Sequence, residues 1–282
     1  MSVFLLCFFV LPPIFFRLLI YIITVILMIE LFKLLEHCWV TKKDLQKKTY
    51  IIITILVGLF ILTISEFIDL EFKAYTYIGI CVFGLFNWII HVIPWISKKK
   101  SFQQKVVQAG YGRHITFQRT TSYPLFIILP LACSFLYLFA DDKHYLFFVL
   151  LIIWLADTGA YISGKRFGRI KIAENISPGK TLEGVIGAIF INVIFMLGVG
   201  FNFSEFNIIG GIIFGFIVTL LSIYGDLFIS WIKRSAGVKD TGNLIPGHGG
   251  FLDRVDSLLL ALPFAALIKI FANTFQSNFL TI

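Results

Sequence analysis

The chain has 282 residues, of which 58% are hydrophobic and only 14% are charged, and its formal net charge is +8. Its mean hydropathy of +0.90 lies far outside the range of soluble domains, so the composition excludes an ordinary soluble enzyme. It predicts instead an all-α fold, a polytopic integral membrane bundle of helices that each cross about 30 Å of hydrocarbon.

The first apolar stretch, residues 3–36, is too long for one membrane helix. Pro12, Pro13 and Arg17 interrupt it, so we expect a hairpin of two helices. Because no basic region precedes its apolar core, we expect an uncleaved anchor and no cleaved signal peptide. Further spans are predicted at 51–65, 76–96, 122–140, 145–163, 182–201, 207–231 and 257–275, which makes nine transmembrane helices, or eight if the first does not cross.

No linker, repeat or low-complexity segment divides the chain, so we expect a single membrane domain over residues 1–282. Amino-terminal helices would occupy residues 1–121, and the part richer in chemistry, the catalytic half, residues 122–282. The four cysteines have no CxxC spacing and therefore predict neither a zinc site nor a disulfide framework.

The basic residues predict the orientation of the bundle. Of the 24 Lys and Arg residues, 20 lie in alternate loops, within 33–48, 98–119, 165–180 and 233–254. Because Lys and Arg accumulate on the cytoplasmic side, these loops and an active site among them should face the cytoplasm, most simply at a bacterial inner membrane. An anionic leaflet and membrane lipids would attract these cations there, so the net charge requires no nucleic-acid partner.

The loop over residues 156–184 combines glycines, hydroxyls and cations. Asp157 lies near the inner end of its helix, Lys165 follows, and Ser177 and Lys180 come directly before the next span. A glycine-rich segment that opens a helix suits phosphate, because backbone N–H groups and the helix dipole favour an anion. The segment SPGKT is no nucleotide P-loop, since the earlier glycine and a preceding strand are missing. A helix cap with topology-setting lysines would explain this loop equally well.

A second loop, residues 224–257, gathers three carboxylates. Asp226 lies within a helix that runs inward, and Asp253 and Asp256 are three residues apart at the start of the next helix, on one face. The cations around them are Lys233, Arg234, Lys239 and Arg254. Oxygen ligands of this kind suit Mg²⁺, which one or two carboxylates commonly hold together with substrate phosphates. The glycines Gly249 and Gly250 would let the backbone approach a ligand closely.

Helix capping is the simpler explanation of Asp253 and Asp256 taken alone, with Arg254 balancing their charge. It does not explain Asp157 and Asp226, which lie within two other helices at the same depth. The role of His248, between glycines, stays open among binding phosphate, orienting a ligand and hydrogen-bonding the loop. Cations and a magnesium site at a membrane surface together indicate phosphoryl or nucleotidyl transfer, in which catalysis is mainly positioning and charge neutralisation.

The segment SWIKRSAGVKDTGNLIPGHGGFLDRVD, residues 230–256, resembles the signature of the phosphatidate cytidylyltransferases, also called CDP-diacylglycerol synthases. The positions in register are Ser230, Lys233, Arg234, Lys239, Asp240, His248, Gly249, Gly250, Asp253, Arg254 and Asp256. The resemblance continues through 225–230, 177–184 and 156–168, whereas the first half is similar only in hydropathy and in its break at 11–13.

The resemblance implies transfer of a cytidylyl group from CTP to phosphatidate, with Mg²⁺ and with a second site for a monovalent cation such as K⁺. Its implied metal ligands are Asp226, Asp253 and Asp256, which with Lys239 form the implied catalytic set. The substrate-binding positions that it implies are Lys165, Ser177, Lys180, Lys233, Arg234, Lys239 and His248. To these we add, as further candidates, Asp157, Asp240, Gly249, Gly250 and Arg254. A homodimer is expected from the resemblance only.

Two other functions fit parts of the pattern. A related CTP-dependent lipid-alcohol kinase would use the same site with a different acceptor. A cation transporter also places carboxylates inside membrane helices, but it would distribute them through the depth of the bilayer, whereas here they gather near one surface.

Overall fold

The computed structural model describes residues 8–10, 12–36, 44–67, 75–82, 84, 86, 117–198, 207–244 and 249–280. Within these ranges the regular structure is helical, and one isolated antiparallel bridge joins Lys171 to Thr181. The helices are α2 (Pro13–Glu36), α3 (Asp44–Phe67), α6 (Phe117–Asp141), α7 (Lys143–Phe167), α8 (Leu182–Gly198), α9 (Ile208–Ser235), α10 (Leu252–Val255) and α11 (Leu258–Leu280). The predicted all-α class is confirmed for the described part of the chain.

Four of the described helices are long and apolar enough to cross a membrane: Pro13–Leu35, Pro124–Asp141, Lys143–Phe167 and Ile208–Arg234. Shorter apolar helices cover Ile51–Ile64, Leu182–Gly198 and Leu258–Thr274. Each of the seven falls on a predicted span. The first helix of the expected hairpin and residues 87–96 lie largely or wholly outside the described ranges, so the total of eight or nine spans stays a prediction.

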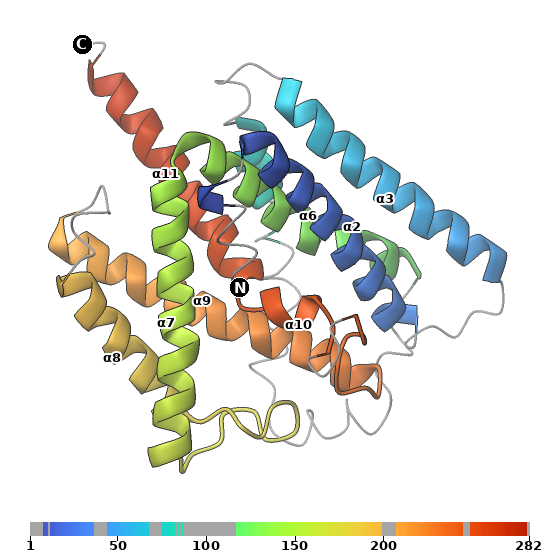
Figure 1. Cartoon of the computed structure of the whole chain (residues 1–282). Coiled ribbons are helices and arrows are strands. Elements are labelled where there is room, and N and C mark those ends of the chain that lie inside the picture. Colours follow the sequence, from blue (N-terminus) through green and yellow to red (C-terminus); the bar gives the residue numbers. More distant parts are fainter. Residues whose placement is uncertain are drawn as a thin grey trace.

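The helices pack as two groups that α11 joins. On one side α2 packs against α6 and α3, and on the other α7 packs against α8, which in turn contacts α9. Helix α11 contacts both α6 and α9, and Figure 1 shows α3 and α8 at opposite edges of the bundle. A continuous apolar core that includes Phe16, Leu131 and Leu262 lies between the groups.

Local sequence explains where several helices begin. Helix α2 begins at Pro13, as the predicted break requires, because proline fits the first turn of a helix. Asp142 caps α7 by accepting hydrogen bonds from the N–H groups of His144 and Tyr145, and Asn207 caps α9 in the same way. The α6–α7 turn lies at one end of the bundle, and the loop that follows α7 lies at the opposite end (Figure 1).

Candidate active site

The loop between α7 and α8 is folded back on the bundle and fixes the position of Lys180. The carboxylate of Glu183 accepts hydrogen bonds from the N–H groups of Arg169 and Ile170, and Lys171 Nζ donates to the carbonyl of Pro178 at 2.6 Å. Buried side chains of the loop and of the helices next to it form a small apolar cluster: Ala156, Ala173, Ile176, Ala188, Ile223 and Leu227. This anchoring places Lys180 directly before α8, beside α9.

Lys180 reaches the carboxylate predicted in the middle of another helix. Its Nζ lies 2.5 Å from Asp226 Oδ2, and Ser230, one turn further along α9, donates a hydrogen bond to Asp226 Oδ1 at 3.2 Å. Asp157 on α7 interacts electrostatically with both Lys180 and Asp226 and lies near Ser257, which directly precedes α11. Residues that the sequence separates by up to 100 positions therefore meet at one place.

Asp256 completes this group, which we call the acidic cluster: Asp157, Asp226 and Asp256, with Lys180. The backbone of Gly225 packs directly against the carbonyl oxygen of Asp256, so a Cβ atom at position 225 would collide with that oxygen and only glycine fits there. Burial raises the pKa of Asp256 well above its usual value, and the negative charge of Asp226 raises it further, against the attraction of Lys233 and Lys180. A cation between Asp226 and Asp256 would relieve this repulsion.

Asp253 lies in a different environment, where both of its carboxylate oxygens already have hydrogen-bond or ion-pair partners within the protein. Its Oδ1 is 2.6 Å from Lys233 Nζ, and its Oδ2 accepts hydrogen bonds from Thr241 N, Thr241 Oγ1 and Gly250 N at 2.9 to 3.0 Å. Burial alone would raise the pKa of Asp253, but these hydrogen bonds and the charge of Lys233 outweigh it, and the pKa is lowered. We call the segment between α9 and α10 the signature loop. Asp253 connects its described parts, since it binds Lys233 at the end of α9, Thr241 and Gly250.

Glu30 on α2 is a participant that the sequence analysis missed. It is only 2% exposed, and its carboxylate accepts hydrogen bonds from the N–H groups of Phe251 at 2.9 Å and Leu252 at 2.7 Å. Thr241 Oγ1 lies 3.4 Å from Glu30 Oε2, but its single proton has a closer acceptor in Asp253 Oδ2. Gly250 allows this approach, because a Cβ there would collide with Thr241 Oγ1 and with Glu30 Oε2. A lone carboxylate in an apolar helix was the signal that could have revealed it.

The remaining predicted residues are divided among three positions. Arg234 holds the end of α9 to the α7–α8 loop, since its Nε donates to the carbonyl of Ile176 and its Nη1 to that of Val238, both at 3.1 Å. Ser177 lies in the turn that precedes Lys180, and Gly249 has a φ of +82°, in the left-handed region that favours glycine. Exposed side chains at the rim are Lys165, Lys239, Asp240 and Arg254. His248 lies outside the described residues.

The described residues contain no group of three or more His, Cys, Asp or Glu side chains arranged to hold a metal ion on their own. Two partly buried, mutually repelling carboxylates, Asp226 and Asp256, nevertheless fit Mg²⁺, because this ion commonly takes one or two carboxylates and completes its shell with water and substrate phosphates. Asp253, the third predicted ligand, would first have to exchange Lys233 for the ion.

An apolar helical bundle with cations and carboxylates gathered at one end defines a membrane protein whose site suits anionic reactants. The chain belongs to the Cytidylyltransferase family, whose model matches residues 1–271.

Similar proteins include the phosphatidate cytidylyltransferase of Haemophilus influenzae, 44% identical over 140 residues, which are 46% of this chain and 48% of that protein. The phosphatidate cytidylyltransferase of Staphylococcus aureus strain COL is 44% identical over 133 residues, 46% of this chain and 51% of the relative. That of Staphylococcus saprophyticus is 40% identical over 156 residues, 53% of this chain and 59% of the relative. The chain thus spans about half the length of the curated relatives it matches.

Proposed function

We propose that the protein transfers a cytidylyl group from CTP to phosphatidate and releases pyrophosphate, leaving CDP-diacylglycerol in the membrane. The observation that carries the proposal is the acidic cluster, in which carboxylates from α7, from α9 and from the turn between α10 and α11 gather around Lys180. Lys180 Nζ lies 2.5 Å from Asp226 Oδ2. The family and the names of the similar proteins support the choice of CTP and phosphatidate.

The reaction needs positioning and charge neutralisation more than a strong base. A phosphate oxygen of phosphatidate, already ionised near neutral pH, attacks the α-phosphorus of CTP, and the bond from that phosphorus to the β-phosphate oxygen breaks as pyrophosphate leaves. Asp226 and Asp256 would hold Mg²⁺, which supplies charge neutralisation on the triphosphate when bound. Lys180 and Lys233 place positive charge between the carboxylates and two anionic reactants.

Asp253 and Glu30 have a supporting role in this proposal. They fix Thr241 and the residues from Gly250 to Leu252 by hydrogen bonds, and so they set the position of Asp256, which follows Leu252 by four residues. The basic loops at 165–180 and 233–254 flank this end of the bundle, which supports a site that faces the cytoplasm of a bacterial cell. The monovalent cation and the homodimer stay predictions.

The test is an assay of the purified protein in detergent with radiolabelled CTP, phosphatidate and Mg²⁺. We expect labelled CDP-diacylglycerol with wild-type protein and with Asp141→Asn, whose carboxylate binds Asn273 at the other end of the bundle. Asp256→Asn should lower the rate by at least about a hundredfold. Label transferred from the γ-phosphate of CTP to a polyprenol, with none in CDP-diacylglycerol, would favour the lipid-alcohol kinase instead.

A further inference from the structure

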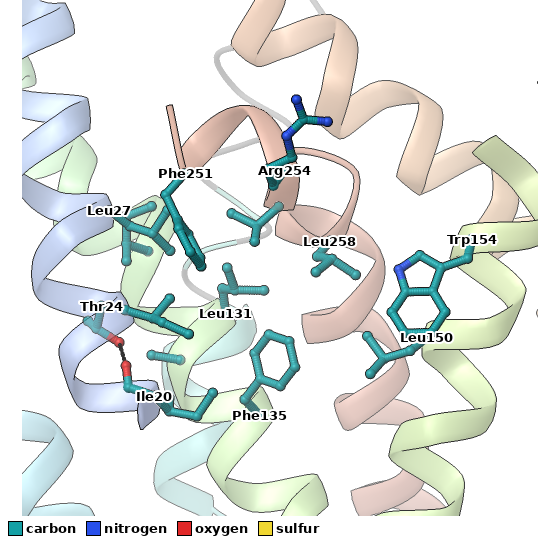
Figure 2. A pocket seen from close by; sticks show the side chains of 14 residues that line it. Ile20, Thr24, Leu27, Leu131, Phe135, Leu150, Trp154, Phe251, Arg254 and Leu258 are labelled. Atoms are coloured by element: carbon teal, nitrogen blue, oxygen red, sulfur yellow. Dashed lines mark hydrogen bonds between the residues drawn. The ribbon is translucent and has the colours of Figure 1, made fainter. Parts of the chain in front are cut away.

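The bundle contains a partly open, apolar cavity of about 540 Å³ between α2, α6, α7 and the segment from α10 into α11 (Figure 2). Aliphatic and aromatic side chains such as Ile20, Leu131 and Phe135 form its walls. The hydroxyl of Thr24 adds little polarity, because it donates to the carbonyl of Ile20 at 2.7 Å. Protein interiors rarely contain voids much larger than a water molecule, and water needs polar partners, so a space of this size and lining suits an apolar occupant.

The short helix α10 separates this cavity from the polar site. Phe251, Arg254, Val255 and Leu258 line the cavity, at the spacing of one helical face. Asp253, on a different face of the same segment, binds Lys233 and belongs to the polar side. Figure 2 shows Arg254 at one end of the cavity with its guanidinium directed away from the interior. An occupant of the cavity would therefore end beside a cation and within one helical turn of the acidic cluster.

We propose that this cavity receives an acyl chain of the lipid substrate, with the lipid phosphate on the Arg254 side. The inference rests on the proposed function, since it identifies where the hydrophobic part of the phosphatidate would lie. A volume of about 540 Å³ is within the range of ligand pockets. If a methylene occupies roughly the 30 Å³ of a water molecule, the volume corresponds to about one fatty acyl chain. The charge of Arg254 favours an anionic headgroup over a neutral one.

The proposal is tested by filling the cavity. Ala132 lines it, whereas Ala140 is exposed on the same helix, so Ala132→Phe and Ala140→Phe are matched variants. Burying one methylene changes binding by about fourfold, so displacing several should raise the KM for dipalmitoyl phosphatidate more than about tenfold in Ala132→Phe. The KM for CTP and the rate with dihexanoyl phosphatidate should stay within about twofold of wild type, a difference smaller than one methylene.

The expected result for Ala140→Phe is the wild-type dependence on chain length. Equal dependence in Ala132→Phe and wild type would overturn the cavity proposal while leaving the proposed function intact. If wild-type protein makes no CDP-diacylglycerol from phosphatidate of any chain length, the proposed function itself fails. The two failures are thus distinguishable.

A second measurement needs no variant and decides the matter if Ala132→Phe does not fold. Phosphatidate with a photoactivatable diazirine at the end of one acyl chain is irradiated with the wild-type protein, and labelled peptides are mapped by mass spectrometry. We expect label within residues 20–27 and 128–135, which contribute to the cavity wall. Label confined to outward-facing side chains such as Ile186 and Ile213 would overturn the proposal. Equal cavity labelling by a phosphatidylcholine with the same probe would also overturn it, because the site would then be a general lipid site.

Discussion

Removing the carboxylate of Glu30 should lower the free energy needed to open the signature loop locally, although Glu30 lies more than 200 residues before its partners in the loop. Glu30→Gln keeps one acceptor oxygen and loses the other, so one buried N–H group, at Phe251 or Leu252, is left without its charged acceptor. A hydrogen bond to a charged group contributes about 1.5–3 kcal/mol, so we expect a loss of about 2 kcal/mol. Glu30→Ala removes both oxygens and should cost about 4 kcal/mol.

These losses of free energy should raise the equilibrium constant for local opening of the loop. With tenfold for each 1.36 kcal/mol, Glu30→Gln should raise the opening constant roughly thirtyfold and Glu30→Ala roughly a thousandfold. Hydrogen exchange followed by mass spectrometry on peptides covering 249–258 measures this change directly. Glu174→Gln is the control, because Glu174 is an exposed residue of the α7–α8 loop. Wild-type exchange of this segment in both Glu30 variants would refute the role assigned to Glu30.

Three further predictions concern the charged groups. Asp256→Asn should raise the thermal midpoint of the metal-free protein at neutral pH, because it removes the charge that burial and Asp226 disfavour; a lowered midpoint would contradict this. Asp253→Asn should cost about 2 kcal/mol at pH 7. Since the pKa of Asp253 is lowered, its contribution is complete above the ordinary value of about 3.9 and disappears as the pH falls through the lower folded pKa; an unfolding difference that stays constant down to pH 3 would count against it. Because the pKa of Asp256 is raised, Mg²⁺ should bind more tightly as the pH rises and release protons in calorimetry, and binding without proton release would exclude this competition.

Hydropathy and charge were sufficient for much of the fold. The predicted spans at 122–140 and 145–163 lie within α6 and α7, and the span at 207–231 begins one residue before α9, because an apolar run of that length with polar ends has few other stable conformations. Helix phase and depth were also sufficient to group Asp226 with Asp256. These are local properties, which a single sequence carries.

The contacts that cross between distant segments could not be predicted in this way. Nothing near Glu30 in the sequence indicates that it binds the backbone at 251 and 252, because that contact depends on how α2 packs against the rest of the bundle. The spacing likewise predicts the same role for Asp253 and Asp256. In the structure, hydrogen bonds and Lys233 lower the pKa of Asp253, whereas burial and the negative charge of Asp226 raise the pKa of Asp256. Arg234 was predicted to bind substrate, and its hydrogen bond to Ile176 shows in addition how it holds the two loops together.

The most direct test of the acidic cluster is divalent-cation binding without turnover. Mn²⁺ binding to the purified protein can be measured from the EPR signal of the free ion, in wild type and in Asp226→Asn, Asp256→Asn and Asp141→Asn. Because loss of even an indirect partner weakens metal binding by about tenfold or more, Asp226→Asn and Asp256→Asn should each weaken Mn²⁺ binding by at least about tenfold, and Asp141→Asn should not. Equal Mn²⁺ affinity in all four proteins would contradict the assignment of Asp226 and Asp256 as the pair that holds the cation.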